Sequence, residues 1–235
     1  MEAIILAGGF GTRLRSVVSN VPKPMAPIGG RPFLELLLDY LVESRFSHAV
    51  LSTGYLHEKI DEHFGSDYRR LRLSYAVENE PLGTGGGLRN ALELCEEDDI
   101  VVLNGDTLFR IDFDDLNRFY HAHPTRLAVV LRQVPDTSRY GSVETDCCDR
   151  IARFTEKSAA GGFGTINGGI YMLNRSLLEE HALGEAFSFE KEILQKQFES
   201  EPFYAYASGA YFIDIGIPED YRRLQSDLSG GDLKE

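Results

Sequence analysis

Apolar and polar positions divide the first half of the chain into two kinds of segment. Short, continuous apolar runs are typical of buried strands, and they lie near residues 2–7, 48–53, 72–77 and 99–104. Amphipathic stretches, with apolar positions three or four residues apart, predict helices near residues 33–45, 57–64 and 85–95. This alternation indicates an α/β fold with a parallel sheet, in which ligands gather at the carboxyl ends of the strands.

The pattern changes after about residue 126, where apolar runs become shorter and turns more frequent. Strands are predicted near residues 127–132, 142–146, 151–155 and 166–173, and helices near 188–199 and 218–226. The sequence shows no internal repeat and no low-complexity linker. We therefore expect one domain in which a mixed sheet is completed by a smaller lobe.

Composition narrows the class of protein. The 235 residues suffice for one α/β domain of ordinary size, and the net charge of −13 argues against a nucleic acid or an anionic membrane surface as partner. We expect no membrane insertion, because no apolar run approaches the length of a membrane span and Met1 leads directly into a predicted strand. The three cysteines lack the number and spacing of a disulfide framework or a zinc site, which suits the reducing cytoplasm.

A glycine-rich loop with two cations follows the first predicted strand. The segment reads Leu6-Ala7-Gly8-Gly9-Phe10-Gly11-Thr12-Arg13, and Lys23 lies ten residues further on. Glycines let backbone N–H groups approach phosphate oxygens, and the cations can neutralise a polyphosphate. Glycine turns are also common without a ligand, and this one lacks the Gly-Lys-Ser/Thr end of a P-loop and the glycine spacing of a dinucleotide fingerprint. The loop is therefore a candidate phosphate site of another type.

Two aspartates follow apolar strands that are far apart in the sequence. Asp106 comes just after the run 100–103, and Asp214 ends a run that precedes a helix with Pro218 in its first turn. Either carboxylate alone could cap the following helix. Together, two converging carboxylates form the hard oxygen site that Mg²⁺ prefers.

In combination, these motifs resemble the signature of the sugar-1-phosphate nucleotidyltransferases, in which Gly-Gly-x-Gly-Thr-Arg follows the first strand and Lys-Pro stands in the next loop. The resemblance extends in order from Ala7 to Tyr221. It implies a single Rossmann-like domain of the GT-A type, with a central mixed, mostly parallel sheet flanked by helices and a smaller sugar-binding lobe. Residues 1–125 would then mainly bind the nucleotide, residues 126–228 mainly the sugar, and residues 229–235 would form a flexible tail.

The resemblance also implies roles for individual residues. The implied catalytic residues are Arg13, Lys23, Asp106 and Asp214, of which the two aspartates would hold Mg²⁺ or Mn²⁺. The implied nucleotide-binding residues are Leu6, Ala7, Gly8, Gly9, Gly11, Thr12, Glu78, Pro81, Gly83, Thr84, Asn104 and Gly105. The implied sugar-phosphate-binding residues are Tyr140, Gly141, Glu156, Lys157, Asn167, Gly168 and Glu190. The sequence departs from the family at Ile217, where threonine is commoner.

Glu78 bears on the choice of base, because the resemblance places it opposite the pairing edge. A carboxylate offers only acceptors, and guanine presents two adjacent donors, N1–H and N2–H. Glu78 therefore favours GTP over UTP or dTTP. Glu80 or backbone groups remain alternative readers of the base.

Among subfamilies, the sequence looks most like the D-glycero-α-D-manno-heptose 1-phosphate guanylyltransferases, which make GDP-heptose for surface glycans such as lipopolysaccharide, capsule or S-layer. Mannose-1-phosphate guanylyltransferases and amino-sugar-1-phosphate uridylyltransferases share many of these residues. The expected partners are thus GTP and a sugar 1-phosphate, with the protein a monomer or homodimer.

Other classes of protein fit less well. A non-catalytic, nucleotide-sugar-sensing relative would be expected to lack Arg13, Lys23 or one of the two aspartates, and all are present. A nicotinamide-linked oxidoreductase would need an acidic residue at the end of the second strand, where the sequence reads Leu51-Ser52-Thr53. The scattered histidines, with no nucleophile elbow, argue against a hydrolytic triad.

Overall fold

Four parallel strands form the centre of the sheet in the computed structural model, which describes residues 1–9, 14, 21–155, 161–181 and 183–230. They are β1 (Glu2–Leu6), β4 (His48–Thr53), β6 (Leu71–Val77) and β7 (Asp99–Asn104), in the order β7-β1-β4-β6. The short strand β5 (Asp67–Tyr68) pairs antiparallel with β6 at the edge. The carboxyl ends of the four parallel strands therefore lie along one edge of the sheet, as the alternation of strands and helices predicts.

Successive side chains of β1 enter two different cores, because neighbouring residues of a strand point to opposite faces. Ala3 and Ile5 pack in one core with residues of α1 (Phe33–Glu43), α2 (His57–Phe64) and α4 (Phe113–Ala122). Ile4 packs in the other core with residues of α3 (Gly83–Leu92). Helices thus cover both faces of the parallel strands, and the open carboxyl edge is left for a ligand.

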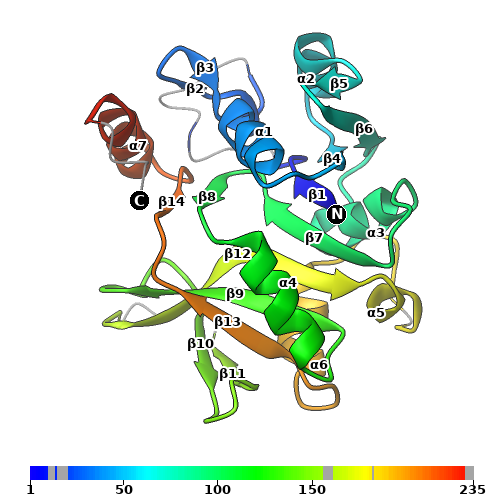
Figure 1. The fold of residues 1–235 in the computed structure, drawn as a ribbon, viewed down its shortest axis with the longest axis vertical. Coiled ribbons are helices and arrows are strands. Elements are labelled where there is room, and N and C mark those ends of the chain that lie inside the picture. Colours follow the sequence, from blue (N-terminus) through cyan, green and yellow to red (C-terminus); the bar gives the residue numbers. More distant parts are fainter. Residues whose placement is uncertain (10–13, 15–20, 156–160, 182, 231–235) are drawn as a thin grey trace.

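The second half of the chain extends the sheet with antiparallel strands. β12 (Gly164–Asn174) pairs antiparallel with both β7 and β9 (Leu127–Val134). β10 (Ser142–Thr145) and β11 (Ile151–Thr155) continue the sheet beyond β12, and β13 (Tyr204–Ser208) runs parallel to β9. Figure 1 shows these strands on one side of the parallel group, with α4 lying across them. The predicted mixed sheet with a parallel centre is confirmed.

Short elements at the carboxyl edge carry the predicted motifs. β8 (Thr107–Phe109) pairs antiparallel with β14 (Phe212–Asp214), β2 (Pro27–Ile28) pairs with β3 (Arg31–Pro32), and a 3₁₀ turn spans Lys23–Met25. The C-terminal helix α7 (Pro218–Gly230) lies beside β2 (Figure 1), where the Tyr221 hydroxyl donates to the carbonyl of Pro27. This helix therefore ties the strand that carries Asp214 to the hairpin that follows Lys23.

The structure differs from the predicted elements in several places. The helix expected near 188–199 is a π-helix over Glu190–Leu194 followed by the short helix α6 (Gln195–Gln197), and α5 (Ser176–Glu179) precedes it. Helix α7 continues through Gly230, two residues past the limit predicted for the folded domain. Elements β8, α4 and β13 were not predicted. No helix in the described part of the chain is long and apolar enough to cross a membrane.

A buried polar network fastens the amino ends of the central strands. The Glu2 carboxylate accepts the backbone N–H groups of Glu96 and Glu97 at 2.6 and 2.7 Å. Its other oxygen lies 2.6 Å from Nδ1 of His48, whose Nε2 lies 2.8 Å from the Ser74 hydroxyl. Burial alone would raise the pKa of Glu2, but these hydrogen bonds stabilise the carboxylate and lower its pKa. The network joins β1, β4 and β6 at the edge opposite the candidate site.

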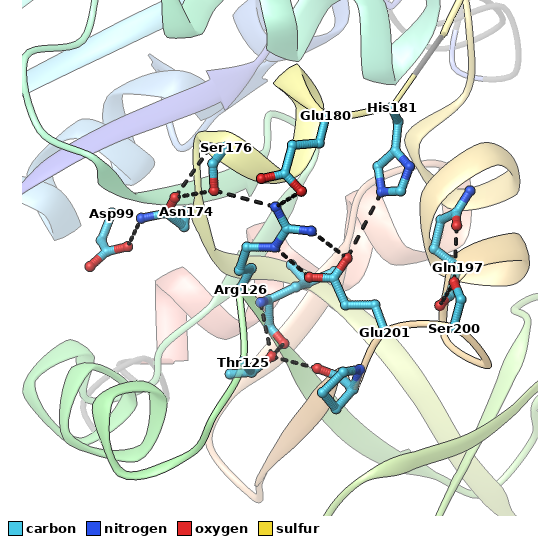
Figure 2. Close-up of polar contacts among 12 residues, drawn as sticks. Asp99, Thr125, Arg126, Asn174, Ser176, Glu180, His181, Gln197, Ser200 and Glu201 are labelled. Atoms are coloured by element: carbon cyan, nitrogen blue, oxygen red, sulfur yellow. Dashed lines mark hydrogen bonds and ion pairs between the residues drawn. The ribbon is translucent and has the colours of Figure 1, made fainter.

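Arg126 fastens the outer part of the sheet in a similar way. Its guanidinium donates to both oxygens of Glu201 at 2.5 and 2.9 Å, and its third nitrogen pairs with Glu180 at 2.6 Å (Figure 2). Arg126 immediately precedes β9, Glu201 lies in the segment before β13, and Glu180 immediately follows α5. A forked, charge-assisted contact of this kind holds its partners in one orientation. The strands that carry the second lobe are thereby fixed to one another.

Candidate active site

A cavity of about 470 Å³ lies at the carboxyl ends of β1 and β7. It is lined by Leu6, Ala7, Gly8, Gly9, Lys23, Pro24, Ser52, Glu78, Pro81, Gly83, Thr84, Asn104, Gly105, Asp106 and Glu190. Every described residue that was predicted to bind the nucleotide is in this lining. Gly11, Thr12 and Arg13 lie outside the described residues, and their predicted roles remain predictions.

Strand pairing brings the two predicted metal ligands together. In the β8–β14 pair, Asp214 stands opposite Thr107, the residue after Asp106. The backbone N–H of Ile215 also donates to the carbonyl of Asp106 at 2.9 Å. Two short strands from distant parts of the sequence therefore bring the two carboxylates together, as the sequence predicts, with Asp106 in the lining of the cavity and Asp214 beside it.

Lys23 lies between the two carboxylates. Its ammonium group contacts Oδ2 of Asp106 and is 3.9 Å from Oδ1 of Asp214, and its side chain is only 10% exposed. Oδ1 of Asp214 also accepts the N–H of Gly216 at 2.7 Å. Burial, and then the negative charge of Asp106, raise the pKa of Asp214, whereas Lys23 opposes this shift.

The residues present fit a divalent cation. Two carboxylates share one ammonium group, so the cluster keeps a negative charge that a cation can neutralise. No cluster of three or more His, Cys, Asp or Glu side chains suited to a metal occurs among the described residues. A cation held by Asp106 and Asp214 would therefore complete its coordination with water and substrate oxygens, which is the habit of Mg²⁺.

Glu78 is held rigidly at the end of β6. Its Oε2 accepts the backbone N–H of Leu82 at 2.9 Å, and its Oε1 accepts the hydroxyl of Ser52 at 3.1 Å. A Cβ built on Gly8 or Gly87 would lie 2.8 or 2.5 Å from Oε1, so a larger residue at either position would displace the carboxylate from this place. Each oxygen accepts one internal donor and keeps a further lone pair for a ligand.

Glu80 occupies a different position from Glu78. It lines a neighbouring cavity of about 370 Å³, which shares Gly8, Glu78 and Pro81 with the 470 Å³ cavity, but it is absent from the lining of the 470 Å³ cavity itself. Of the two glutamates considered from the sequence, Glu78 is the one placed at the candidate nucleotide cavity.

The glycines after Pro81 serve a packing role that the sequence did not suggest. The N–H of Gly85 donates to the carbonyl of Phe187 at 2.9 Å, and a Cβ on Gly86 would lie 2.4 Å from the carbonyl oxygen of Glu185. The start of α3 is thus pressed against residues 185–187. Close backbone approach of this kind requires glycine.

A second cavity, of about 430 Å³, adjoins the first at Glu190. Tyr140, Gly141, Asn167 and Glu190, which were predicted to bind the sugar phosphate, are in its lining. The lining residues that were not predicted are Val143, Phe154, Ser188, Lys191, Leu194 and Gln195. Several of these could have been found by placing the residues near Glu190 on one face of the helix predicted over 188–199.

Internal contacts hold the polar groups of this second cavity in place. Oε2 of Glu190 accepts the hydroxyls of Thr84 and Ser188 at 2.7 and 2.9 Å. Asn167 donates to the Tyr171 hydroxyl at 2.7 Å and accepts the N–H of Gly169 at 2.9 Å. Glu190 thereby connects the loop that bounds the first cavity to the wall of the second.

The remaining predicted sugar-site residues are placed differently. Burial, followed by the charge of Asp214, raises the pKa of Tyr140 to about 12, so its hydroxyl stays a donor at neutral pH. Gly168 lines neither of the two cavities, because its Cα faces the ring of Phe109, and a Cβ there would lie 2.5 Å from that ring. Glu156 and Lys157 lie outside the described residues.

Known proteins of similar sequence and structure point to one chemistry. A family model described as nucleotidyl transferase matches residues 2–230. The chain is 45% identical to the D-glycero-alpha-D-manno-heptose 1-phosphate guanylyltransferase of Aneurinibacillus thermoaerophilus, over 97% of this chain and 98% of that protein. It is 42% identical to the Campylobacter jejuni protein of the same name, over 94% and 97% of the two chains. The crystal structure of HddC from Yersinia pseudotuberculosis complexed with GMP-PN superposes with a TM-score of 0.85 at 37% identity, covering 97% of this chain and 99% of that one.

Proposed function

Because the chain belongs to the nucleotidyl transferase family, we propose that it forms GDP-D-glycero-α-D-manno-heptose and pyrophosphate from GTP and D-glycero-α-D-manno-heptose 1-phosphate. Family membership confirms the resemblance carried by the glycine-rich loop and the two aspartates. The names of the two relatives and the guanine nucleotide bound to HddC support the choice of base and sugar. One observation of the structure carries the proposal: the cavity lined by Lys23 and Asp106, with Asp214 3.9 Å from the Lys23 ammonium group, adjoins a second cavity at Glu190.

The proposed reaction is an in-line displacement at the α-phosphorus of GTP. An oxygen of the sugar phosphate forms the new P–O bond, and the bond between the α-phosphorus and its bridging oxygen breaks to release pyrophosphate. The attacking phosphate is already anionic at neutral pH, so the site needs no general base. Catalysis then comes from holding the reactants in line and from neutralising charge.

The residues divide this work according to their positions. Lys23 lies at the cavity wall beside the aspartates and neutralises charge where the α-phosphate would lie. By the family resemblance, Arg13 would hold the departing pyrophosphate and Lys157 the incoming phosphate. Glu190 and Asn167 would accept and donate hydrogen bonds to sugar hydroxyls in the second cavity.

Asp106 and Asp214 are the residues that would hold Mg²⁺, with Mn²⁺ as an alternative of similar ligand preference. A bound divalent cation would neutralise charge on the α-phosphate as the displacement proceeds. Asp214 is fixed for this role by the N–H of Gly216, and Asp106 by the hydroxyl of Thr107. We place the enzyme in the cytoplasm, as a monomer or homodimer, making a precursor for surface glycans.

The test is a matrix of nucleoside triphosphates against sugar 1-phosphates, with pyrophosphate release as the readout in the presence of Mg²⁺. GTP, ATP, CTP, UTP and dTTP would be combined with heptose, mannose, glucose and N-acetylhexosamine 1-phosphates. Turnover confined to GTP with the heptose phosphate is the expected result. Turnover with UTP would overturn the base assignment, preference for mannose would overturn the sugar, and no turnover with any pair would favour a sensing role.

A further inference from the structure

The π-helix gives the second cavity a wall that the proposed reaction does not yet use. Its defining hydrogen bond runs from the N–H of Gln195 to the carbonyl of Glu190, five residues earlier. Glu190, Lys191, Leu194 and Gln195 all line the cavity. Turns of this rare type often occur at functional sites, because the wider turn changes which side chains share a face.

Lys191 and Gln195 lie away from the reacting groups. Glu190 lines both cavities, whereas Lys191 and Gln195 line only the second. The phosphate of a bound sugar must lie near Asp106, which lines only the first cavity. A sugar bound with its anomeric carbon at the junction therefore points its remote atoms toward Lys191 and Gln195.

The polar ends of these two side chains are also uncommitted. Within the described part of the chain, neither the Lys191 ammonium nor the Gln195 amide has a hydrogen-bond or ion-pair partner, whereas Asn167 and Glu190 are both engaged. The cavity surface beside them is apolar, formed by Val143, Phe154 and Leu194. Long polar side chains beside an apolar cavity surface suit a ligand that presents both hydroxyl and C–H groups.

We infer that Gln195 and Lys191 form the subsite for the exocyclic hydroxyl-bearing arm of the heptose and determine the preference for heptose over hexose. This inference rests on the proposed function. A manno-heptose 1-phosphate exceeds mannose 1-phosphate by one CHOH unit, carried on the exocyclic arm beyond the pyranose ring. The Gln195 amide both donates and accepts, and Lys191 donates, so the pair matches a vicinal diol. Mannose has only one hydroxyl on this arm and cannot satisfy both side chains.

The test is the ratio of kcat/KM values for heptose 1-phosphate and mannose 1-phosphate, measured with GTP by direct competition in one mixture. Gln195→Ala should lower this ratio by about tenfold or more, which corresponds to the loss of one or two hydrogen bonds. Lys191→Met should lower it in the same direction. The KM for GTP should not move, because neither residue lines the first cavity.

Lys196→Met is the matched control. Lys196 adjoins Gln195 in α6, but its ammonium group pairs with Glu192 on the surface and it lines neither of the two cavities. This variant should keep the wild-type ratio, and thermal melting of all three variants would show that they fold.

Three outcomes would overturn the inference. An equal loss with both sugars would mean that the side chains contact the shared pyranose ring. An unchanged ratio in folded variants would mean that they contact neither sugar. If the wild-type protein itself fails to use heptose 1-phosphate with GTP, the proposed function fails and the subsite fails with it. The wild-type control therefore separates the two failures.

Discussion

Replacing Glu78 by glutamine should lower kcat/KM for GTP by about 30- to 150-fold while leaving the fold intact. In the structure, Oε2 of Glu78 accepts from Leu82 and Oε1 accepts from Ser52. A glutamine can keep both contacts, because its oxygen can accept the Leu82 N–H while its NH₂ donates to the Ser52 hydroxyl. The substitution should therefore have little effect on stability.

The loss arises at the nucleobase. Guanine presents two adjacent donors, and the carboxylate of Glu78 meets them with two acceptors, whereas glutamine offers one acceptor and one donor. One hydrogen bond to a charged group is then lost and a donor faces a donor, which together cost about 2–3 kcal/mol. The same change should improve kcat/KM for UTP relative to GTP, because uracil presents one donor beside an acceptor.

The assay is the steady-state rate of pyrophosphate release with GTP and with UTP, at saturating sugar phosphate. Glu80→Gln is the matched control, since Glu80 carries the same charge but is absent from the lining of the 470 Å³ cavity. Glu80→Gln should keep the wild-type preference. Equal losses in the two variants, or an unchanged GTP rate in Glu78→Gln, would refute the assignment of Glu78 as the base reader.

Three further substitutions, one of them paired with a control substitution, test other features of the molecule. Asp106→Asn should lower kcat on the order of 10³-fold in pyrophosphate release with little change in melting temperature, and a near-normal rate with Mg²⁺ would contradict its catalytic role. Gly86→Ala should destabilise the protein by about 1–3 kcal/mol in chemical denaturation, because the new methyl group would lie 2.4 Å from a carbonyl oxygen. Gly9→Ala should not destabilise the protein, because no atom lies within 4 Å of a Cβ built at that position. An equal loss of stability in the two variants would refute the packing argument. Glu2→Gln should cost about 1.5–3 kcal/mol at pH 7, through weaker hydrogen bonds to two backbone N–H groups. Hydrogen bonding lowers the pKa of Glu2 in the folded protein below its usual 4.5. The stability that the Glu2 carboxylate contributes is therefore present above pH 4.5 and is lost as the pH falls through the pKa of the folded protein. If Glu2→Gln were still less stable than the wild type by the same amount at low pH, this reasoning would be contradicted.

The parallel core could be predicted because its signals are local. Runs such as Ile100–Leu103 are continuous and apolar, as strands buried on both faces are, and the intervening helices are amphipathic. Helix α4 carried the same kind of signal and was missed: Asp112 caps it by accepting the N–H of Asp115, and Phe113, Leu116 and Tyr120 repeat at helical spacing.

Other features could not be predicted because they depend on partners far along the chain. Strand β13 reads Tyr-Ala-Tyr-Ala-Ser, which becomes a strand only by pairing with β9. The π-helix is likewise invisible to periodicity, since its apolar positions also suit an α-helix. Gly83 and Thr84 were predicted to bind the nucleotide, but the sequence did not show that the neighbouring Gly85 and Gly86 pack against the backbone of residues 185–187, a contact across about a hundred residues.

The candidate site also contains residues that could be predicted from the sequence and residues that could not. Asp106 and Asp214 were found because each follows an apolar strand, and the β8–β14 pairing brings them together. Lys191 and Gln195 were missed because, in isolation, a lysine or glutamine on a helix is indistinguishable from a solvated surface residue. Their place near Glu190 on the predicted helix was the available signal, and the position of that helix beside Phe154 and Val143 shows that they line a cavity.

The measurement that tests the central claim most directly is a single competition reaction. The protein would be incubated with GTP, Mg²⁺ and equal concentrations of heptose 1-phosphate and mannose 1-phosphate, and the nucleotide sugars formed would be identified by mass. We expect GDP-heptose to predominate, one CH₂O unit heavier than GDP-mannose, with pyrophosphate released in equal amount. A product that is mainly GDP-mannose, or an absence of any nucleotide sugar, would contradict the assignment.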